Sequence, residues 1–338
     1  MKKFKKQQLG LFVAKNILIV LMLVIVVVMT FVNSNFLTLA NFINILRNIS
    51  VQGILACGLT TLIISGGLDL SFGSTIGLTT LLLPIISNWF DQRGISTYLG
   101  ISVAFLVCIL AGIIIGSMNA FFVTKYHMPP MIATLAMQYV VYGFAGTLKN
   151  GYPVYDFPKW FTIFGKGKVG MIPISVIIAL VFCTVFYFLL NKTKFGRTIY
   201  AVGGSIEAAR LSGINVKKYQ YAAYIIMQVI AVTGSVVFSS QMMSGSHSYG
   251  KDYALLVMSA VVIGGTSIAG GAGSMLGTLK GLLFLGLVLN AMTIANLGEY
   301  TQYIVRGGLI IFAIVLNMTQ QALALKVQAK ETEKQLTR

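Results

Sequence analysis

This 338-residue chain has few charged residues, and far fewer of them are acidic than basic. Charged residues make up only 10% of the chain, with eight Asp and Glu against 25 Lys and Arg. Soluble domains carry about a quarter charged residues. Hydrophobic residues reach 57% and the mean hydropathy is +0.85. This balance excludes an ordinary soluble domain and indicates an all-α integral membrane protein. The net charge of +17 does not predict nucleic-acid binding, because the basic residues lie mostly at the ends of apolar segments.

Cysteine is also scarce, and so are the motifs of catalysis. Cys57, Cys108 and Cys183 are odd in number and lie inside apolar stretches, so we interpret them as small buried hydrophobes rather than disulfides or metal ligands. No pair of Cys or His has the spacing of a metal site. The chain also lacks the Gly-Lys-Ser/Thr ending of an ATP-binding loop. We therefore expect no catalytic residue, no metal and no cofactor on this chain, and we expect it not to be an enzyme.

One strongly polar run, Lys192–Lys218, lies between the apolar segments Met171–Leu190 and Tyr221–Ser240. Its basic residues outnumber its single acid, Glu207. These basic residues are Lys192, Lys194, Arg197, Arg210, Lys217 and Lys218. Short loops rich in Lys and Arg stay on the cytoplasmic side of a membrane. Residues 191–219 are therefore predicted to form a cytoplasmic loop.

This loop also has a helical pattern. Gly203 and Gly204 can end a helix or take a left-handed turn, and Ser205 can then cap a new helix. Residues 206–212, IEAARLS, favour a helix, and Gly213 ends it. A short helix outside the bilayer is marginally stable alone. On the residues alone, a solvated connector and a helix that docks on a partner are equally supported.

The first interruption of an apolar segment begins at Gly66, in the run GGLDLSFGSTIGL. Two glycines followed by Asp69 and Ser71 predict a broken helix whose restart is capped by one of these side chains. A carboxylate at membrane depth costs ~2.5 to 3.5 kcal/mol on insertion scales, so it must be capped, paired or hydrated. We favour capping over contact with a solute.

A second glycine-rich interruption, GGTSIAGGAGSMLG, covers residues 264–277. It resembles a phosphate-binding loop only in its glycines, because it lacks the lysine and hydroxyl ending. With the first interruption it places one broken helix in each half of the chain. Paired breaks are typical of transporters built from an internal repeat, whose solute route lies between the halves. The sequence therefore predicts a weak internal pseudo-repeat.

Ten apolar segments, each near the ~20 residues that a bilayer needs or shorter where broken, predict ten spans. They are Ile17–Phe31, Val51–Ser65, Phe72–Trp89, Tyr98–Val123, Met131–Leu148, Met171–Leu190, Tyr221–Ser240, Tyr253–Ile263, Gly281–Asn296 and Tyr303–Leu316. Residues 33–48 are expected to form an outer connector, and Lys149–Gly170 and Gln241–Asp252 outer loops. An even number of spans places both tails, residues 1–15 and 320–338, in the cytoplasm. In the fourth span, Gly112 and Gly116 predict close helix packing.

The run EAARLSG, Glu207–Gly213, resembles the Glu-Ala-Ala-x-x-x-Gly loop by which permeases of bacterial ABC importers contact their ATPase subunits. Its surroundings are similar to the ribose and simple-sugar permease family. Three further segments resemble that family in the same order: GGLDLSFGS from Gly66, IATL at Ile132–Leu135, and GGTSIAGG at 264–271. The resemblance covers the chain from about Phe36 to Leu316.

The resemblance implies a single transmembrane permease domain, residues 1–338, in a bacterial inner membrane, surrounded by lipid. It implies a second permease copy, a separate ATPase that holds ATP and Mg, an extracytoplasmic solute-binding protein, and a small neutral solute such as ribose. The residues implied to contact the ATPase are Glu207, Ala208, Ala209, Arg210 and Gly213. The residues assigned to the translocation path or its motifs are Asp69, Ser71, Phe72, Ser74, Thr134, Gln138, Tyr142, Thr266 and Asn290. Of the latter, Phe72, Gln138, Tyr142 and Asn290 suit a sugar and equally suit packing.

Three positions depart from the family pattern. Tyr142 stands where an arginine is common, and Ala254 and Leu256 stand where acids are common. These changes are consistent with a divergent solute or with altered gating, and both readings stay open.

An ion-coupled carrier is the main alternative function. Such a carrier needs titratable groups in mid-membrane, whereas Asp69 is nearly the only acid within a predicted span. A carrier that works alone also has no role for the predicted cytoplasmic helix over residues 206–212. A membrane scaffold or channel leaves all of the motifs unexplained.

Overall fold

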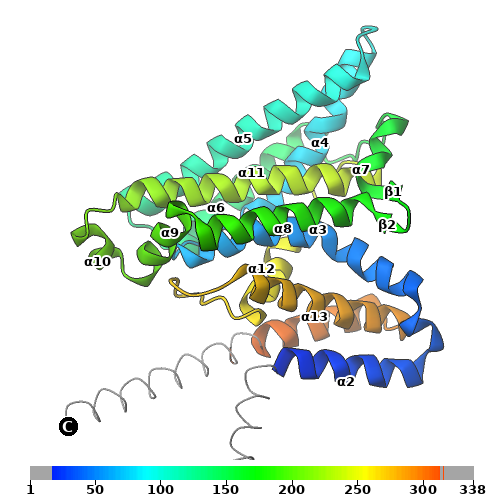
Figure 1. Ribbon diagram of the computed structural model, residues 1–338. Helices are drawn as coiled ribbons and strands as arrows, with labels where there is room; N and C mark the ends of the chain where they lie inside the picture. Colours follow the sequence, from blue (N-terminus) through cyan, green and yellow to red (C-terminus); the bar gives the residue numbers. More distant parts are fainter. Residues whose placement is uncertain (1–16, 313–314, 316–338) are drawn as a thin grey trace, which may run out of the picture.

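The computed structural model describes residues 17–312 and residue 315. Apart from two two-residue strands, its named elements are helices (Figure 1), which confirms the all-α prediction. The predicted tails, residues 1–15 and 320–338, lie outside the described residues. The helices at the predicted spans are α2 (Ile17–Val32), α3 (Leu39–Ile64), α4 (Phe72–Asp91), α5 (Thr97–Lys125), α6 (Pro130–Thr147), α8 (Ile174–Lys192), α11 (Val216–Met242), α12 (Tyr253–Ile263), α13 (Met275–Ile294) and a final helix over residues 299–312.

The shorter elements lie at the two ends of these helices. A 3-10 turn, η1 (Ser34–Leu37), joins α2 to α3. Between α6 and α8 lie η2 (Lys159–Thr162), α7 (Ile163–Lys166) and the antiparallel strands β1 (Lys168–Val169) and β2 (Ile172–Pro173). At the opposite end lie α9 (Lys194–Gly204) and α10 (Ile206–Leu211) (Figure 1).

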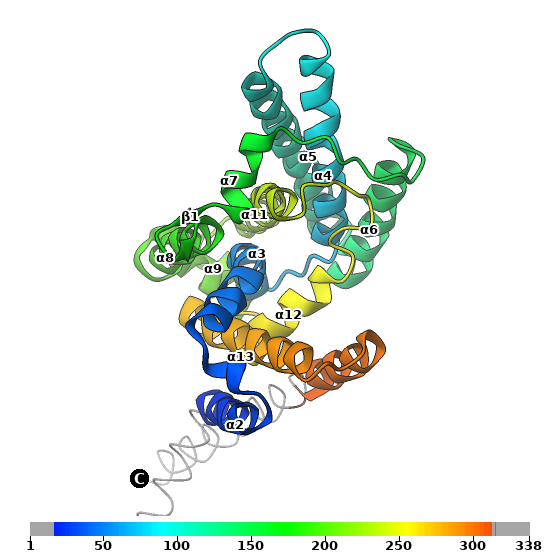
Figure 2. The same cartoon turned by 90° about the vertical axis from the view of Figure 1, so that its right-hand side faces the viewer.

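Helix α3 is the centre of the fold. Viewed end-on, it lies between α8, α11, α12 and α13 (Figure 2), and every residue from Ile49 to Ile64 is buried. A helix that is apolar on all faces is stable only when other helices surround it. The prediction of an outer connector over residues 33–48 is wrong, because α3 already begins at Leu39. Thr38 caps it by accepting a hydrogen bond from the Asn41 amide.

Close glycine packing joins α5 to α11, as the spacing of Gly112 and Gly116 predicted. A Cβ atom on Gly116 would lie 2.9 Å from both the Cα of Ile225 and the carbonyl oxygen of Tyr224. Gly112 faces Gln228 and Val232 one turn further along. Small residues at both positions let the two backbones approach, which strengthens dispersion contacts in a lipid environment.

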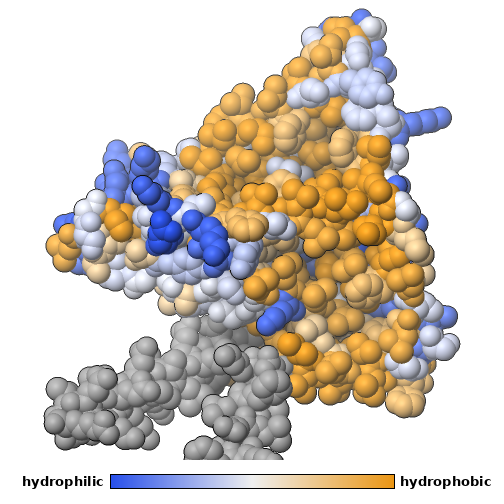
Figure 3. Space-filling model, in the orientation of Figure 1, coloured by the Kyte–Doolittle hydropathy of each residue, from blue (hydrophilic) through white to orange (hydrophobic). Residues whose placement is uncertain are grey.

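Five helices are long and apolar enough to cross a membrane by length and composition: α3, α5, α8, α11 and α13. Helices α2 and α12 are apolar but shorter, and α4 and α6 occupy two further predicted spans. One face of the molecule is mostly hydrophobic, and hydrophilic residues gather over α9 and α10 at one end (Figure 3). These apolar helices indicate that the chain is a multi-pass membrane protein.

The predicted loop Gln241–Asp252 is present between the end of α11 and the start of α12, but its close packing against α4 was not predicted. Residues 243–252, which fold back along α4, are here called the re-entrant segment. Glycines make this approach possible: a Cβ on Gly245 would overlap the Thr80 carbonyl oxygen, and one on Gly77 would overlap that of His247. Gly250 packs in the same way on Gly73, the second residue of α4.

The packing of α3 on α8 can be tested through two buried cysteines. The Sγ atoms of Cys57 and Cys183 lie 3.8 Å apart, so a small shift brings them to the ~2.05 Å of a disulfide. We expect oxidation of membranes with copper-phenanthroline to leave one alkylatable thiol per denatured chain, that of Cys108, as measured by mass spectrometry. The control Cys183→Ala should keep both of its thiols. Three thiols in the oxidised wild-type chain would contradict the α3 and α8 contact.

Candidate functional site

The polar run Lys192–Lys218 folds into two short helices, α9 and α10. Thr193 caps α9 by accepting from the Gly196 amide at 3.1 Å. Helix α9 ends at Gly204, as predicted, and Ser205 begins α10 by accepting from the Ala208 amide at 3.2 Å. Gly213 has a φ of +78°, the left-handed conformation expected of a helix-terminating glycine. The predicted short helix is therefore present, and α9 is an addition to it.

Helix α10 presents most of its surface to solvent. The side chains of Glu207, Ala208 and Arg210 are exposed, as is Gly213, whereas Ala209 is buried. Leu211 is 80% exposed, although it lies at the hydrophilic end of the molecule (Figure 3). An exposed leucine on a helix outside the membrane favours a docking surface over a purely solvated connector.

Glycines connect α9 to both helix breaks, forming what we call the glycine junction: Gly66, Gly203, Gly204, Gly270 and Gly271. A Cβ on Gly203 would overlap the carbonyl oxygen of Ile64, and one on Gly271 would lie 2.6 Å from the Cα of Gly204. The Gly271 amide donates to the Ile64 carbonyl at 2.9 Å. The end of α9 therefore contacts the end of α3 and the break between α12 and α13 directly.

A tyrosine adds a second link at the same place. The Tyr200 hydroxyl, on α9, donates to the Gly273 carbonyl at 2.9 Å. Burial raises the pKa of Tyr200 above its ordinary value, so the phenol stays protonated and keeps its role as donor. If α9 and α10 move, the α12–α13 break must therefore move with them, or these contacts are broken.

The first break is held by a fully buried carboxylate, Asp69. Its Oδ1 accepts from the Ser71 amide at 2.8 Å and from the Ser71 hydroxyl at 2.6 Å. Its Oδ2 accepts from Gln228 Nε2 at 2.7 Å and from Asn119 Nδ2 at 3.1 Å. Ser71 is the N-cap residue of α4 and makes no side-chain capping bond, so Asp69 binds the residue before the helix and the predicted side-chain cap of α4 is not formed. The carboxylate is not exposed, so it does not face a solute in this conformation.

Sequence reasoning missed the two amide partners of Asp69. Gln228 lies on α11 and Asn119 on α5, and both are fully buried. The Oε1 of Gln228 accepts in turn from the Thr75 hydroxyl at 2.6 Å. Their signal in the sequence was an amide side chain within a long apolar run, which is costly in lipid unless it is paired. The cluster ties α4, α5 and α11 to the break.

The other residues assigned to the translocation path are not gathered at one place. Phe72, Ser74, Thr134 and Thr266 are buried, and Gln138 and Tyr142 are half-buried on α6. Thr134 joins the first break, because its hydroxyl accepts from the Leu70 amide at 3.2 Å.

Asn290, also assigned to the path, is committed to another partner. It exchanges two side-chain hydrogen bonds with Asn41, at 2.8 and 3.0 Å, and so joins α13 to α3. The structure therefore gives it a packing role between these helices.

The three positions that depart from the family pattern lie in different surroundings. The Tyr142 ring lies 5.1 Å from the His247 ring of the re-entrant segment. Ala254 is buried beside Gly73. Leu256 lines a polar cavity of about 330 Å³.

This polar cavity lies between α3, the re-entrant segment, the start of α12, α13 and the final helix. Its polar lining includes Gln52 near the middle of α3, Lys251 and Asp252 of the re-entrant segment, and Arg306 of helix 299–312. Within the part of the chain described by the structure, no group of three His, Cys, Asp or Glu side chains could hold a metal ion.

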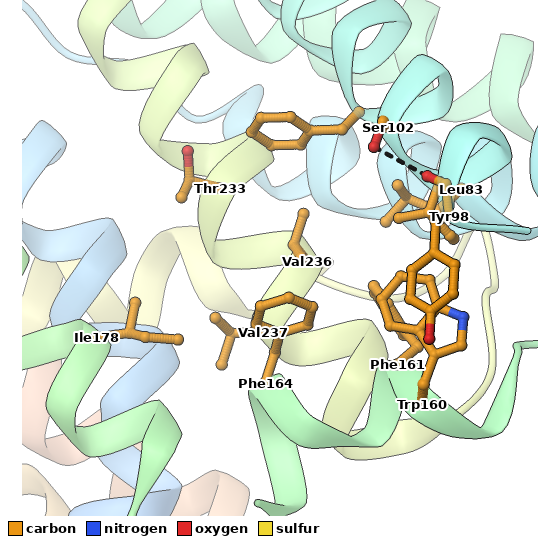
Figure 4. Close-up of a pocket in the computed structure, with 12 residues that line it drawn as sticks. Leu83, Tyr98, Ser102, Trp160, Phe161, Phe164, Ile178, Thr233, Val236 and Val237 are labelled. Carbon is orange, nitrogen blue, oxygen red and sulfur yellow. Dashed lines mark hydrogen bonds between the residues drawn. The ribbon is translucent and has the colours of Figure 1, made fainter.

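A second cavity, of about 470 Å³, is almost wholly apolar (Figure 4). Tyr98 stacks on Trp160 at its edge, with ring centroids 4.5 Å apart. Phe164, Ile178 and Val236 line the rest. A lining with so few polar groups suits a lipid chain. It offers few hydrogen-bond partners to a hydroxylated solute.

The broken helices, the exposed helix pair α9 and α10 and the polar cavity between helices are typical of a transport subunit of a membrane. The chain matches the family model described as "Branched-chain amino acid transport system / permease component" over residues 41–314. The chain therefore belongs to this permease family.

Curated relatives agree with this placement. The ribose import permease protein of Escherichia coli K12 is 34% identical over 312 residues, which cover 90% of this chain and 93% of that protein. The ribose import permease protein of Bacillus subtilis 168 is 32% identical over 88% of this chain and 91% of its own length. The galactose/methyl galactoside import permease protein of Haemophilus influenzae Rd is 30% identical over 91% and 95%, respectively. No solved structure matches the chain.

The glycine junction offers a matched pair of variants. In Gly203→Ala the new methyl group meets the Ile64 carbonyl, whereas in Gly204→Ala nothing lies within 4 Å of it. Overpacking of this kind costs roughly 1–3 kcal/mol, so we expect Gly203→Ala to lower the Tm of the purified chain in detergent. Gly204→Ala should leave the Tm unchanged or raise it slightly. Equal Tm values for both variants would contradict the junction.

Asp69 provides a second test. In Asp69→Asn one oxygen can still accept from Ser71, whereas in Asp69→Leu all four donors lose their acceptor. Each buried donor left unsatisfied costs about 1–3 kcal/mol. We expect thermal stability in detergent to fall in the order wild type, Asp69→Asn, Asp69→Leu. An equal loss of folded protein in both variants would exclude the clustering role.

Proposed function

We propose that this chain is the transmembrane permease subunit of an ABC importer for a small neutral polar solute, most simply a monosaccharide such as ribose. The observation that carries the proposal is α10, a short exposed helix joined through α9 to both helix breaks. Relatives named as ribose and galactose import permeases, matched over about nine-tenths of their length, support the solute class. ATP and Mg would be bound by a separate ATPase.

The proposed mechanism uses the glycine junction as its mechanical link. An ATPase that closes on ATP pushes on α10, and the close contacts of Gly203 and Gly271 pass the displacement to α3 and α12. Because α9 contacts both breaks, one push changes two helix pairs together. Binding of ATP inside and of the solute outside are then coupled through two states of one pore.

The proposal extends to the assembly and its membrane. Residues 1–338 form one transmembrane permease domain with ten spans related by a pseudo-repeat, in a bacterial inner membrane with both tails inside. Two copies pair, with an ATPase below and a solute-binding protein above. The basic residues around α9 and α10 support this orientation. An ion-coupled carrier has less support, because Asp69 is enclosed by four hydrogen bonds.

The docking role of α10 is tested by charge reversal. We expect Glu207→Lys to reduce the ATPase that co-purifies with the tagged chain at least about tenfold, because a misplaced charge at an interface is strongly unfavourable. The matched control is Glu299→Lys, another exposed glutamate, which lies beyond α13. Gly213→Leu should act like Glu207→Lys, since leucine is strained at a φ of +78°. Membrane insertion of all three variants should be normal. Uptake and ATPase recovery that survive both α10 changes would exclude docking there.

The importer as a whole is tested by purification of the tagged chain from gently solubilised membranes of its own host. Recovery of an ATPase with a phosphate-binding loop, together with ATP-dependent uptake of labelled ribose or galactose by the complex in liposomes, is the expected result. Uptake by the chain alone, driven by an ion gradient, would favour the carrier instead.

A further inference from the structure

We propose that the polar cavity is where the solute contacts this chain during its passage, and that Arg306 and Asp252 select for hydroxyl groups there. This inference rests on the proposed function, because it assumes that the chain transports a solute. None of the residues assigned to the path from the sequence lines this cavity, so it is a new site.

Arg306 is the strongest pointer to a ligand. It lies within the final helix, eight residues after Gly298, and its Nε atom is buried without a hydrogen-bond partner among the described residues. A basic side chain inside a membrane helix is costly, and it is usually retained for function. The guanidinium also lies 5.4 Å from the Tyr303 ring on the same helix, and Arg306 is part of the cavity lining. A donor in this position suits an incoming hydroxyl.

The remaining lining supplies both donors and acceptors. Asp252 and Gln52 offer oxygens, whereas Lys251, Arg306 and Gln52 offer N–H groups. A sugar hydroxyl both donates and accepts, so such a mixed lining can bind several hydroxyls at once, with charge-assisted bonds from the ionised groups. An apolar solute would leave these groups unsatisfied and would be excluded.

Aromatic rings form the apolar wall. Phe238 contacts the rings of Tyr249 and Tyr253 edge to face, with centroids 5.3 and 5.4 Å away, and all three residues line the cavity. Such ring pairs hold one another in place. The volume of about 330 Å³ is at the lower end of the ~300–1,000 Å³ of ligand pockets. The cavity therefore suits a single small hydroxylated ring with one apolar face.

The first experiment measures initial uptake of labelled D-ribose and D-galactose by host cells that carry the complete importer. The variants are Arg306→Gln and Arg306→Lys, and the control is Arg93→Gln, an exposed arginine in the turn after α4. We expect Arg306→Gln to lower uptake about tenfold or more, the effect of losing one charge-assisted hydrogen bond. Arg306→Lys should be intermediate and Arg93→Gln normal, at equal chain levels and equal ATPase recovery.

The outcomes separate the two proposals. If the wild-type importer takes up neither sugar, the proposed sugar import fails and this inference fails with it. If the wild type imports sugar and Arg306→Gln, present at normal levels, imports it equally well, only the assignment of the cavity is overturned.

A second measurement covers the case in which Arg306→Gln does not fold. Lys251→Cys, in a chain whose three native cysteines are replaced by alanine, places a thiol in the cavity lining. We expect a membrane-impermeant thiol reagent to label it, and D-ribose import to slow that labelling, while mannitol does not. The control Tyr155→Cys, on an exposed loop side chain, should react equally in both sugars. A thiol at 251 that ribose does not protect would overturn the proposal.

Discussion

The fold depends on one constraint: a backbone interrupted inside a membrane must find its hydrogen-bond partners within the protein. The two breaks meet this requirement together. The Ile64 carbonyl, at the end of α3, accepts from the Gly271 amide in the α12–α13 break, and the Asp69 carboxylate holds the Ser71 amide where α4 begins. Neither break is satisfied by its own segment alone, so contacts between distant segments determine how the central helices pack in this conformation.

Glycine makes this arrangement possible and also makes it sensitive to small displacements of the helices. Where backbones touch without side chains between them, as at Gly203 and Ile64, there is no flexible group to absorb a displacement. Packed contacts of this kind tend to change between discrete arrangements rather than deform gradually. Because α9 and α10 are joined to the helix core through such a contact, they are suited to transmitting force to it. The same contact explains why a solvated connector is a poor description of α9 and α10.

Features encoded in local sequence were predictable, and features that depend on distant partners were not. The breaks at Gly66 and Gly264, the cap at Ser205 and the terminator Gly213 follow from residue type and apolar period, and the structure contains them. The loop over residues 243–252 was predicted, but its packing against α4 was missed because nothing in its own residues identifies the glycines of α4 as its partner. Gln228 and Asn119 were missed because nothing local pairs them with Asp69. The same limit applied to Arg306, whose cavity is lined by residues of α3, α11, α12, α13 and the re-entrant segment as well as its own helix.

Helix α12 connects the glycine junction to the polar cavity. It begins at Tyr253, which lines the polar cavity, and ends at Ile263, next to the second break. At 1.5 Å per residue, its 11 residues span roughly 16 Å, which is long enough to join the two sites. Because a helix of three turns is stiff along its axis, a displacement of the glycine junction moves the cavity wall as well. The shortness of α12, which makes it a poor span by length alone, is what brings the re-entrant segment and its charged residues down to the depth of Gln52.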